Sequence, residues 1–171
     1  TDRGSNGYWL APVPKRKNPM NYWLMKSEPD VFGIEHLNKL PNKTEHWDGV
    51  RNYQARNMMR DSMKKGDCVL FYHSNCDLPG VVGLAEVAKE AYPDFTAWDV
   101  NSKYYDVKSS LENPRWFMVN IRFKTKFKRT VSLAEMREQW GLQDMPLVRK
   151  GNRLSIMSVT KKQWEIILAM E

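Results

Sequence analysis

Four stretches of the sequence place polar side chains beside aromatic ones, each directly after a predicted strand or within a predicted loop. They are Lys26-Ser27-Glu28-Pro29, Trp47-Asp48-Gly49-Val50-Arg51-Asn52-Tyr53-Gln54-Ala55-Arg56, Phe71-Tyr72-His73-Ser74-Asn75, and Tyr92-Pro93-Asp94 with Tyr104-Tyr105-Asp106. A protein that accepts an extruded base needs flat aromatic walls for stacking, hydrogen-bond partners for the base edge, and cations for the phosphates. The four stretches together supply this mixture, so they favour recognition of a nucleic-acid base.

Each stretch taken alone has an ordinary structural interpretation. Trp47 could pack in the core, as large aromatic side chains usually do. Asp48-Gly49 could be a simple turn, and Arg51 and Arg56 could lie on a solvated helix face. The functional interpretation therefore depends on the four stretches occurring together.

The sequence holds none of the common catalytic or metal-binding motifs. It has no glycine-rich phosphate loop, no G-x-S-x-G and no H-E-x-x-H. A metal site would have to gather the scattered His36, His46 and His73, and a Cys76–His73 nucleophile pair would have to form across a predicted turn. We therefore expect no metal, no cofactor and no catalytic residue.

Composition indicates one intracellular domain. The 171 residues fit a single domain, and no apolar run reaches the roughly 18 residues that a membrane span needs. Two cysteines are too few for a disulfide framework, and no heptad pattern predicts an oligomer, so we expect a reduced monomer. We expect it in the cytoplasm of a bacterium, or in the nucleus or cytoplasm of a eukaryote. The net charge of +7 allows a nucleic-acid partner but does not require one.

The predicted order begins after a tail. Residues 1–20 have no periodicity and carry a short basic run, so we interpret them as a flexible tail and residues 21–171 as the domain. Apolar and β-branched runs predict strands at 22–25, 68–72, 81–87, 116–123 and 152–157. The strand at 81–87 has no charge before Glu86, which indicates burial on both faces.

Helices are predicted between and after these strands. Apolar spacing indicates helices near 32–40 and 52–64, and Ser132 with Glu135 forms a capping box for a helix to about Trp140. Thr160 caps a final helix, and residues 92–115 form a long aromatic-rich loop of the kind that is often functional. With no regular βαβ alternation, we expect an α+β fold whose mixed or antiparallel sheet curls into a barrel.

Seven segments of the chain closely resemble the EVE domain family, which belongs to the PUA-like superfamily. They are YWLMKSEPD (22–30), WDGVRNYQARNMMR (47–60), GDCVLFYHSN (66–75), GVVGLAEVAKEAYPD (80–94), SKYYDVKS (102–109), NPRW (113–116) and GNRLSIMSVT (151–160). The resemblance covers Tyr22 to the C-terminus. It implies a PUA-like fold, a mostly antiparallel β-barrel decorated by short helices. It also implies recognition of modified bases, such as methyl- or hydroxymethylcytosine in DNA.

A wider similarity to YTH domains, which hold N6-methyladenine of RNA in an aromatic cage, suggests roles for individual residues. By that analogy Trp47 is one wall of the cage and Tyr104 or Tyr105 the opposite wall, while Ser27 and Glu28 contact the base. The complete predicted pocket is Lys26, Ser27, Glu28, Trp47, Asp48, Gly49, Val50, Tyr53, Phe71, Tyr72, His73, Tyr92, Tyr104 and Tyr105. The predicted phosphate contacts are Arg51, Arg56 and Arg153, with Lys26 also within reach.

Three alternatives remain open. Some PUA-like relatives hydrolyse small amides with a lysine and a carboxylate, and Lys26 with Glu28 or Asp48 could imitate that arrangement. A nucleophilic lysine must be neutral part of the time, so a lowered pKa at Lys26 would favour this enzyme. An RNA-binding module without selectivity for modified bases would share the same pocket. A protein-interaction domain would instead present a large apolar surface patch.

Overall fold

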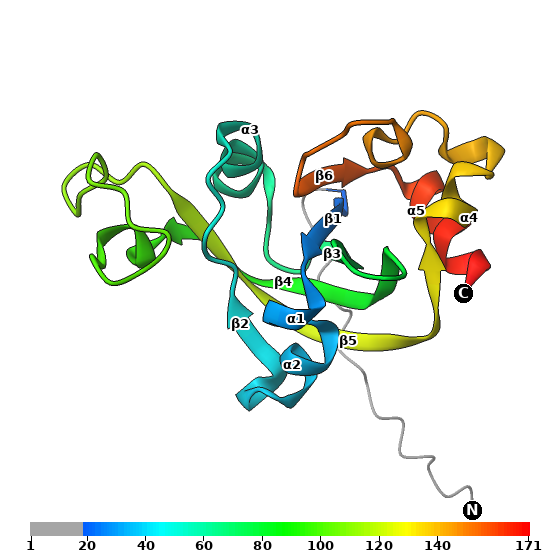
Figure 1. Ribbon diagram of the computed structural model, residues 1–171, viewed down its shortest axis with the longest axis horizontal. Coiled ribbons are helices and arrows are strands. Elements are labelled where there is room, and N and C mark those ends of the chain that lie inside the picture. Colours follow the sequence, from blue (N-terminus) through cyan, green and yellow to red (C-terminus); the bar gives the residue numbers. More distant parts are fainter. Residues whose placement is uncertain (1–18) are drawn as a thin grey trace, which may run out of the picture.

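A single six-stranded sheet forms the centre of the protein, seen in a computed structural model that describes residues 19–171 (Figure 1). The order across the sheet is β2-β5-β4-β3-β1-β6. All neighbouring strands are antiparallel except β1 and β3. The strands are β1 (Tyr22–Ser27), β2 (Thr44–His46), β3 (Cys68–His73), β4 (Gly80–Pro93), β5 (Phe117–Ser132) and β6 (Ile156–Val159). The tail predicted at 1–20 lies outside the described residues, apart from its last two.

Short helices surround the sheet. The α-helices are α1 (Pro29–Phe32), α2 (Ile34–Lys39), α3 (Tyr53–Asn57), α4 (Leu133–Arg137) and α5 (Lys161–Met170). The 3-10 turns are η1 (Pro41–Lys43), η3 (Phe95–Trp98), η4 (Trp140–Leu142) and η5 (Pro146–Val148), and η2 (Met58–Ser62) is a π-helical turn. The α+β class is confirmed.

The predicted closed barrel is wrong. Closing a sheet requires its two edge strands to pair with each other. Here β2 pairs only with β5, β6 pairs only with β1, and within residues 19–171 no strand joins the two edges. The edge strands are the shortest of the sheet, with three and four residues, and cannot supply the long staggered pairing that closure needs.

Helices bury both faces of the sheet. Along β1, Trp23 and Met25 point into one apolar cluster while Leu24 points into the other, as the alternation of strand side chains requires. The first cluster is covered by α2, α3 and η2, and the second by α4, α5 and the turns η4 and η5. Each fully buried large apolar side chain contributes about 1.5–3 kcal/mol relative to an exposed one.

Most predicted elements are present, with shifted ends. Ser132 and Glu135 form the predicted capping box of α4, and Thr160 caps α5 with Gln163. The helix predicted over 52–64 changes to a π-helical turn after Asn57. The last strand begins at Ile156 rather than at residue 152, and β2 was not predicted at all.

Two features of the sheet position the candidate site. The β4–β5 connection, residues 94–116, projects from one end of the sheet (Figure 1). Trp47 follows β2 and continues its pairing, because the Trp47 amide donates to the carbonyl of Val119 on β5 at 2.8 Å. Within residues 19–171, no helix has the length and apolar character to cross a membrane.

Candidate functional site

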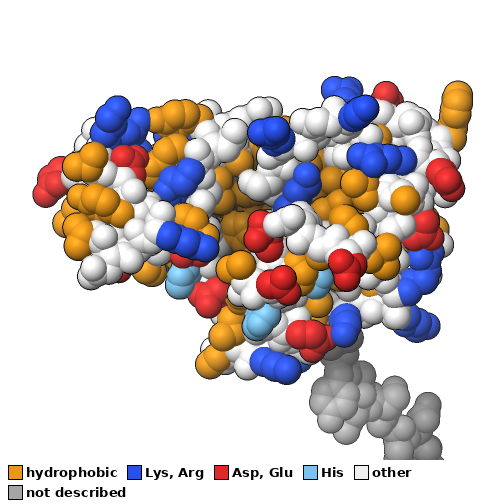
Figure 2. Space-filling view, in the orientation of Figure 1, with side chains coloured by type: hydrophobic (Ala, Val, Ile, Leu, Met, Phe, Trp, Pro, Cys, Tyr) orange, Lys and Arg blue, Asp and Glu red, His pale blue; other side chains and the backbone are white. Residues whose placement is uncertain are grey.

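A cavity of about 1240 Å³ lies between the sheet, α1 and the β4–β5 connection. Figure 2 shows this face hollowed near its centre, with basic side chains above the hollow and carboxylates mostly below it. The predicted residues that line the cavity are Lys26, Ser27, Glu28, Trp47, Asp48, Gly49, Val50, Arg51, Tyr104 and Arg153. Lining residues that the sequence did not single out as site residues include Phe32, Glu45, His46, Ser74, Asn75, Lys103 and Ser155.

Trp47 and Tyr104, both predicted from the sequence as candidate aromatic walls, line the cavity. Trp47 lines the cavity although only 8% of it is exposed, because the rings of Phe32 and Phe71 pack edge-on against it at 6.3 and 5.6 Å between centroids. This packing fixes the plane of the indole before any ligand arrives. Tyr104 comes from the β4–β5 connection, so the two walls belong to distant segments of the chain.

The absence of a side chain at Gly49 allows the Tyr104 ring to pack against the backbone there. The Gly49 backbone has φ +77°, and a Cβ there would lie 2.5 Å from the Tyr104 ring. Real side chains do not tolerate that approach, so only glycine fits both the conformation and the space. The Asp48-Gly49 turn of the sequence is therefore a contact surface for the second aromatic wall.

Asp94 joins the cavity loop to the β4–β5 connection. Its carboxylate is 1% exposed and accepts from the Gly49 amide at 2.9 Å and from Arg51 Nη1 at 3.1 Å. The same carboxylate accepts from the amide and the hydroxyl of Thr96. The sequence placed Asp94 in one of the four mixed stretches but did not predict this anchoring role.

The N–H donors of the Arg51 guanidinium are all engaged in hydrogen bonds within the protein. A guanidinium has five N–H donors. Those of Arg51 make five hydrogen bonds, to the Tyr104 carbonyl twice, the Val50 carbonyl, Asp94 and the Thr96 hydroxyl. No donor is left for a ligand, which argues against the predicted phosphate contact at Arg51 and gives it a positioning role.

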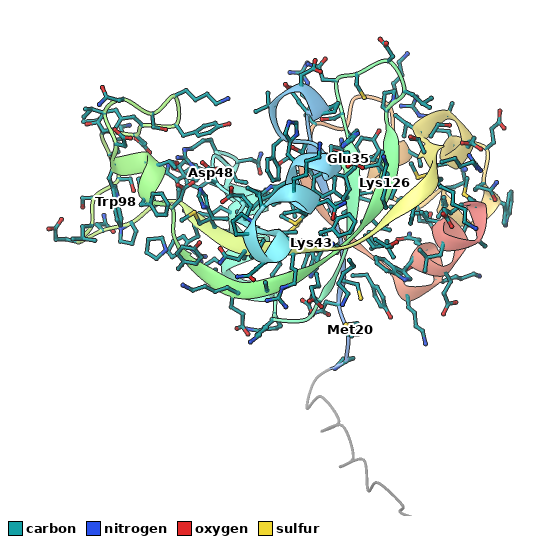
Figure 3. All side chains as sticks on the ribbon, turned by 90° about the horizontal axis from the view of Figure 1, so that it is seen from below. Met20, Glu35, Lys43, Asp48, Trp98 and Lys126 are labelled. Atoms are coloured by element: carbon teal, nitrogen blue, oxygen red, sulfur yellow. The ribbon has the colours of Figure 1, made fainter. Side chains whose placement is uncertain are left out.

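Carboxylates gather at one side of the cavity. Burial raises the pKa of Asp48, and the neighbouring carboxylates of Asp94 and Glu45 act in the same direction. His46 opposes the shift, since its Nε2 lies 4.0 Å from Asp48 Oδ2. His46 Nδ1 is 2.7 Å from Glu45 Oε1. Figure 3 shows Asp48 between the sheet and the projecting connection that carries Trp98.

Besides Arg51, which is paired with Asp94, the cations that line the cavity are Lys26, Lys103 and Arg153. None of the three has an ion-pair partner in the described part of the chain. Lys26 is half-buried, and burial lowers the pKa of its ammonium group. These three side chains can therefore form an ion pair with an anionic ligand without first breaking an ion pair with a carboxylate of the protein.

Hydrogen bonds hold Ser27 and Glu28, at the end of β1, in place. The Ser27 hydroxyl donates to the Phe32 carbonyl at 2.5 Å, and Glu28 accepts from Asn75 Nδ2 at 3.3 Å. Ser27 still offers an acceptor oxygen and Glu28 a second carboxylate oxygen toward a ligand. Both residues are thus held in place without losing their capacity to bind.

Several predicted pocket residues do not line the cavity. Phe71 and Tyr72 are 0% and 2% exposed and point into opposite apolar clusters, because helices cover both faces of β3. His73 Nε2 accepts from the amide of Ile34 at 3.1 Å, and burial lowers the pKa of its ring. The Tyr92 hydroxyl is 2.5 Å from Asn120 Oδ1. Of these side chains, Phe71 packs directly against Trp47 and so supports the cavity lining.

Three more predicted residues lie outside the cavity. Tyr105 is 43% exposed and does not share the cavity with its neighbour Tyr104. Tyr53 and Arg56 belong to α3, where they contact each other and the β4–β5 connection. In the part of the chain that the structure describes, no group of three His, Cys, Asp or Glu residues could hold a metal ion.

Gly49→Ala is expected to lower the free energy of unfolding and to remove ligand binding. The positive φ costs about 1–2 kcal/mol for a residue with a Cβ, and the clash displaces the Tyr104 ring as well. Urea unfolding and ligand titration measure the two effects. Gly151→Ala is the matched control, because Gly151 has φ +82° and open space around its Cβ position. Equal losses in the two variants would show that Tyr104 does not depend on Gly49.

Comparison with known proteins gives consistent matches over almost all of the described chain. The model of the EVE domain family matches residues 21–170. Thymocyte nuclear protein 1 of Danio rerio is 45% identical over 166 residues, which are 87% of this chain and 71% of the relative.

Solved structures with the same fold include a bacterial protein and a human one. A Pseudomonas putida protein has a TM-score of 0.84 and 48% identity, over 87% of this chain and 98% of the other. Human THYN1, crystallised in complex with 5-methylcytosine-containing DNA, has a TM-score of 0.83 and 41% identity, over 88% and 98%.

Proposed function

The chain belongs to the EVE domain family, and from that premise we propose that it is a nucleic-acid reader whose cavity accepts one extruded, modified base. Methyl- or hydroxymethylcytosine in DNA is the base class we propose. The observation that carries the proposal is that Trp47 and Tyr104, two flat rings from distant segments, line one cavity together with carboxylates and unpaired cations. The human relative in complex with 5-methylcytosine-containing DNA supports DNA as the polymer.

The two rings hold the base by stacking. Base–aromatic stacking contributes about 1–3 kcal/mol per base, as judged by alanine substitution. A methyl or hydroxymethyl group adds about 1–3 kcal/mol when an apolar pocket has room for it, so preference for the modified base will be moderate. Because extrusion from a duplex costs a few kcal/mol, single-stranded DNA should bind more tightly than duplex.

Carboxylates at the cavity select bases that carry an amino group. Asp and Glu accept hydrogen bonds from the N4 amino group of cytosine. Glu28 and Asp48 both line the cavity, as does the hydroxyl-bearing Ser27. Thymine and uracil have no exocyclic amino group and would place a carbonyl oxygen against a carboxylate. We therefore propose that cytosine-type edges are favoured over thymine.

Lys26, Lys103 and Arg153 are the proposed phosphate contacts. A carboxylate-free cation neutralises a phosphate without breaking an ion pair, and each such contact contributes a salt-dependent term to the affinity. The cavity exceeds the usual 300–1,000 Å³ of small-molecule sites, which leaves room for the sugar and phosphates beside the base. Relative to the set predicted from the sequence, Lys103 is added, and Arg51 and Arg56 are not among the contacts proposed at the cavity.

Asp48→Asn is expected to stabilise the free protein and to weaken base selection. Because burial raises the pKa of Asp48, the folded protein holds this proton more tightly than the unfolded chain does. The protonated side chain thus favours folding below the ordinary pKa of 3.8, and that advantage is lost as pH rises through the raised pKa. Asn is neutral at every pH, so the variant should need more urea to unfold at pH 7.

Urea unfolding at pH 7 and pH 4.5 checks this sign. The difference between Asp48→Asn and the native protein should shrink toward the lower pH. Asp99→Asn, at an exposed carboxylate of the β4–β5 connection, is the control and should show little change at either pH. A variant that is less stable at pH 7 would show that Asp48 is held by favourable contacts instead.

A hydrolase is the second candidate, because burial lowers the pKa of Lys26. A lysine that acts as a nucleophile must be neutral part of the time. Against this, the described residues place no carboxylate in ion-pair distance of Lys26, and its ammonium instead lies 5.6 Å from the centre of the Tyr72 ring. Incubation with small amides and nucleosides, with Lys26→Arg as the control, tests it. Turnover lost in that variant would favour the hydrolase.

A titration panel tests the reader. Short fluorescent oligonucleotides carrying cytosine, methylcytosine, hydroxymethylcytosine, adenine or N6-methyladenine are compared as DNA and RNA at two salt concentrations. We expect one modified cytosine in DNA to bind several-fold more tightly than cytosine. Equal affinities that follow salt alone would contradict the proposal, and tighter RNA binding without preference for a modified base would favour the RNA-binding alternative. The monomeric state and the cellular location stay predictions.

A further inference from the structure

An exposed tyrosine beside the cavity is flanked by two arginines. Tyr53 on α3 is 46% exposed and stacks on Trp116, with ring centroids 4.9 Å apart and planes at 22°. The Arg56 guanidinium lies 4.6 Å from the centre of the Tyr53 ring. The Arg115 guanidinium lies 5.8 Å from the same ring and donates to its hydroxyl. The buried indole thus fixes an exposed ring between two positive charges.

The positive charge of the two arginines is little neutralised by carboxylates of the protein. Arg56 donates to neutral acceptors, the side-chain oxygen of Asn57 and the carbonyl of Arg115, and has no carboxylate partner in residues 19–171. Arg115 has one, Asp106, at 3.5 Å. That carboxylate already accepts from Trp116 Nε1 at 2.7 Å, and this hydrogen bond lowers the pKa of Asp106. Of the two guanidiniums, only that of Arg115 therefore has a carboxylate partner within residues 19–171, and this carboxylate also accepts from Trp116.

This group is continuous with the cavity wall. The Arg51 guanidinium lies 5.5 Å from the Tyr104 ring on one side and 5.3 Å from the Trp116 ring on the other. Trp116 in turn carries Tyr53. Successive nucleotides of one strand rise about 3.4 Å along a duplex, so a strand with a base at Tyr104 reaches Tyr53 within a few nucleotides.

We infer that Tyr53, Arg56 and Arg115 form a second nucleic-acid subsite, outside the cavity, that takes the phosphate and base of a nucleotide near the captured one. The inference rests on the proposed function. Guanidiniums bind phosphates through paired N–H donors, and an exposed ring accepts a base of any sequence by stacking. Figure 2 shows basic side chains over α3 and the β4–β5 connection, above the hollow. A single-stranded segment next to the flipped base fits both features.

The test separates this subsite from the cavity by ligand length. The ligands are the mononucleotide 5-methyl-dCMP, which fills only the cavity, and a nine-nucleotide single-stranded DNA with one central 5-methylcytosine. The variant is Arg56→Gln with Arg115→Gln. The control, Lys128→Gln with Lys162→Gln, removes the same charge from the end of β5 and from α5, far from the β4–β5 connection (Figure 1).

We expect the arginine variant to bind the nine-nucleotide DNA about tenfold more weakly at low salt, with its salt slope reduced by about 1.4, because each neutralised single-strand phosphate contributes about 0.7. Its affinity for the mononucleotide should equal that of the native protein. Tyr53→Leu, which removes the stack and no charge, should weaken only the longer DNA and leave the salt slope unchanged. Thermal unfolding of each variant verifies the fold.

Two outcomes would overturn the inference. If the arginine variant and the control bind the nine-nucleotide DNA alike, the subsite does not contact nucleic acid, and a protein partner becomes the better occupant. If the arginine variant also loses the mononucleotide, the three residues support the cavity and form no separate site. A native protein that does not prefer 5-methyl-dCMP over dCMP would instead refute the proposed function, since that comparison does not involve the arginines.

Discussion

Asp94→Ala is expected to lower the free energy of unfolding by about 3–5 kcal/mol, the cost of removing one partner of a buried ion pair. The variant leaves the Gly49 amide without its side-chain acceptor and removes the carboxylate that pairs with the Arg51 guanidinium. The Thr96 amide and hydroxyl lose theirs too. Because these groups join the cavity loop to the β4–β5 connection, ligand binding should be lost as well. Urea unfolding and oligonucleotide titration measure the two effects.

Two further variants define the cause. Asp94→Asn keeps one acceptor oxygen and should lose less stability than Asp94→Ala. Asp99→Ala, at an exposed carboxylate in the same connection whose one donor within residues 19–171 is the Asn101 amide, should cost about 1 kcal/mol, as for the loss of a cap. If Asp94→Ala costs no more than Asp99→Ala, the cavity loop is held by other contacts.

Trp47→Ala is expected to reduce both stability and affinity. Removing a buried tryptophan side chain costs about 3–5 kcal/mol of stability. Losing the stacking wall costs a further 1–3 kcal/mol of binding free energy, which is about 5- to 150-fold in Kd. Preference for the modified base should disappear, because that preference depends on a base held in one plane. Affinity is measured at a temperature where unfolding curves show the variant to be folded.

The chain offers a matched control for this substitution. Trp140, in η4, is 93% exposed and does not line the cavity, so Trp140→Ala removes the same side chain with little effect on stability or binding. Trp47→Phe keeps a flat ring and should retain part of the selectivity. A Trp47→Ala protein that still prefers the modified base would show that the indole is only a core residue, its ordinary structural interpretation.

Features decided by neighbouring residues could be predicted from the sequence. The caps at Ser132 and Thr160 depend on side chains three residues apart, and both are present. Trp47, Asp48 and Gly49 were placed together by one short motif, and the structure keeps them together at the cavity. Local chemistry of this kind does not depend on how the rest of the chain folds.

Features that depend on packing between segments far apart in the sequence could not be predicted from it. Phe71 and Tyr72 belong to a strand that helices cover on both sides, and nothing in the strand itself reveals the second cover. Tyr104 and Tyr105 are neighbours of the same type, and Tyr104 lines the cavity through contacts with Gly49 and Arg51, which lie about fifty residues away in sequence. The open sheet likewise depends on the shortness of its edge strands, of which β2 carries no clear sequence signal.

The role of Asp94 could have been suspected. It follows a strand and precedes a short helical turn, and its side chain accepts from the Thr96 amide as an N-cap does. Its bonds to Gly49 and Arg51 span more than forty residues of sequence and required the structure. The same holds for Arg51. The sequence predicted that it contacts phosphate, but in the structure its donors make five hydrogen bonds within the protein.

The most direct test of the central proposal follows the methyl group itself. A single-stranded DNA with one ¹³C-methyl-labelled 5-methylcytosine is bound to the protein and observed by NMR. If the base lies between Trp47 and Tyr104, its methyl resonance shifts by ring currents, shows contacts to the aromatic protons of both side chains, and loses the shift in Tyr104→Ala. If the DNA binds while its methyl resonance stays where it is in free DNA, the cavity does not hold the modified base.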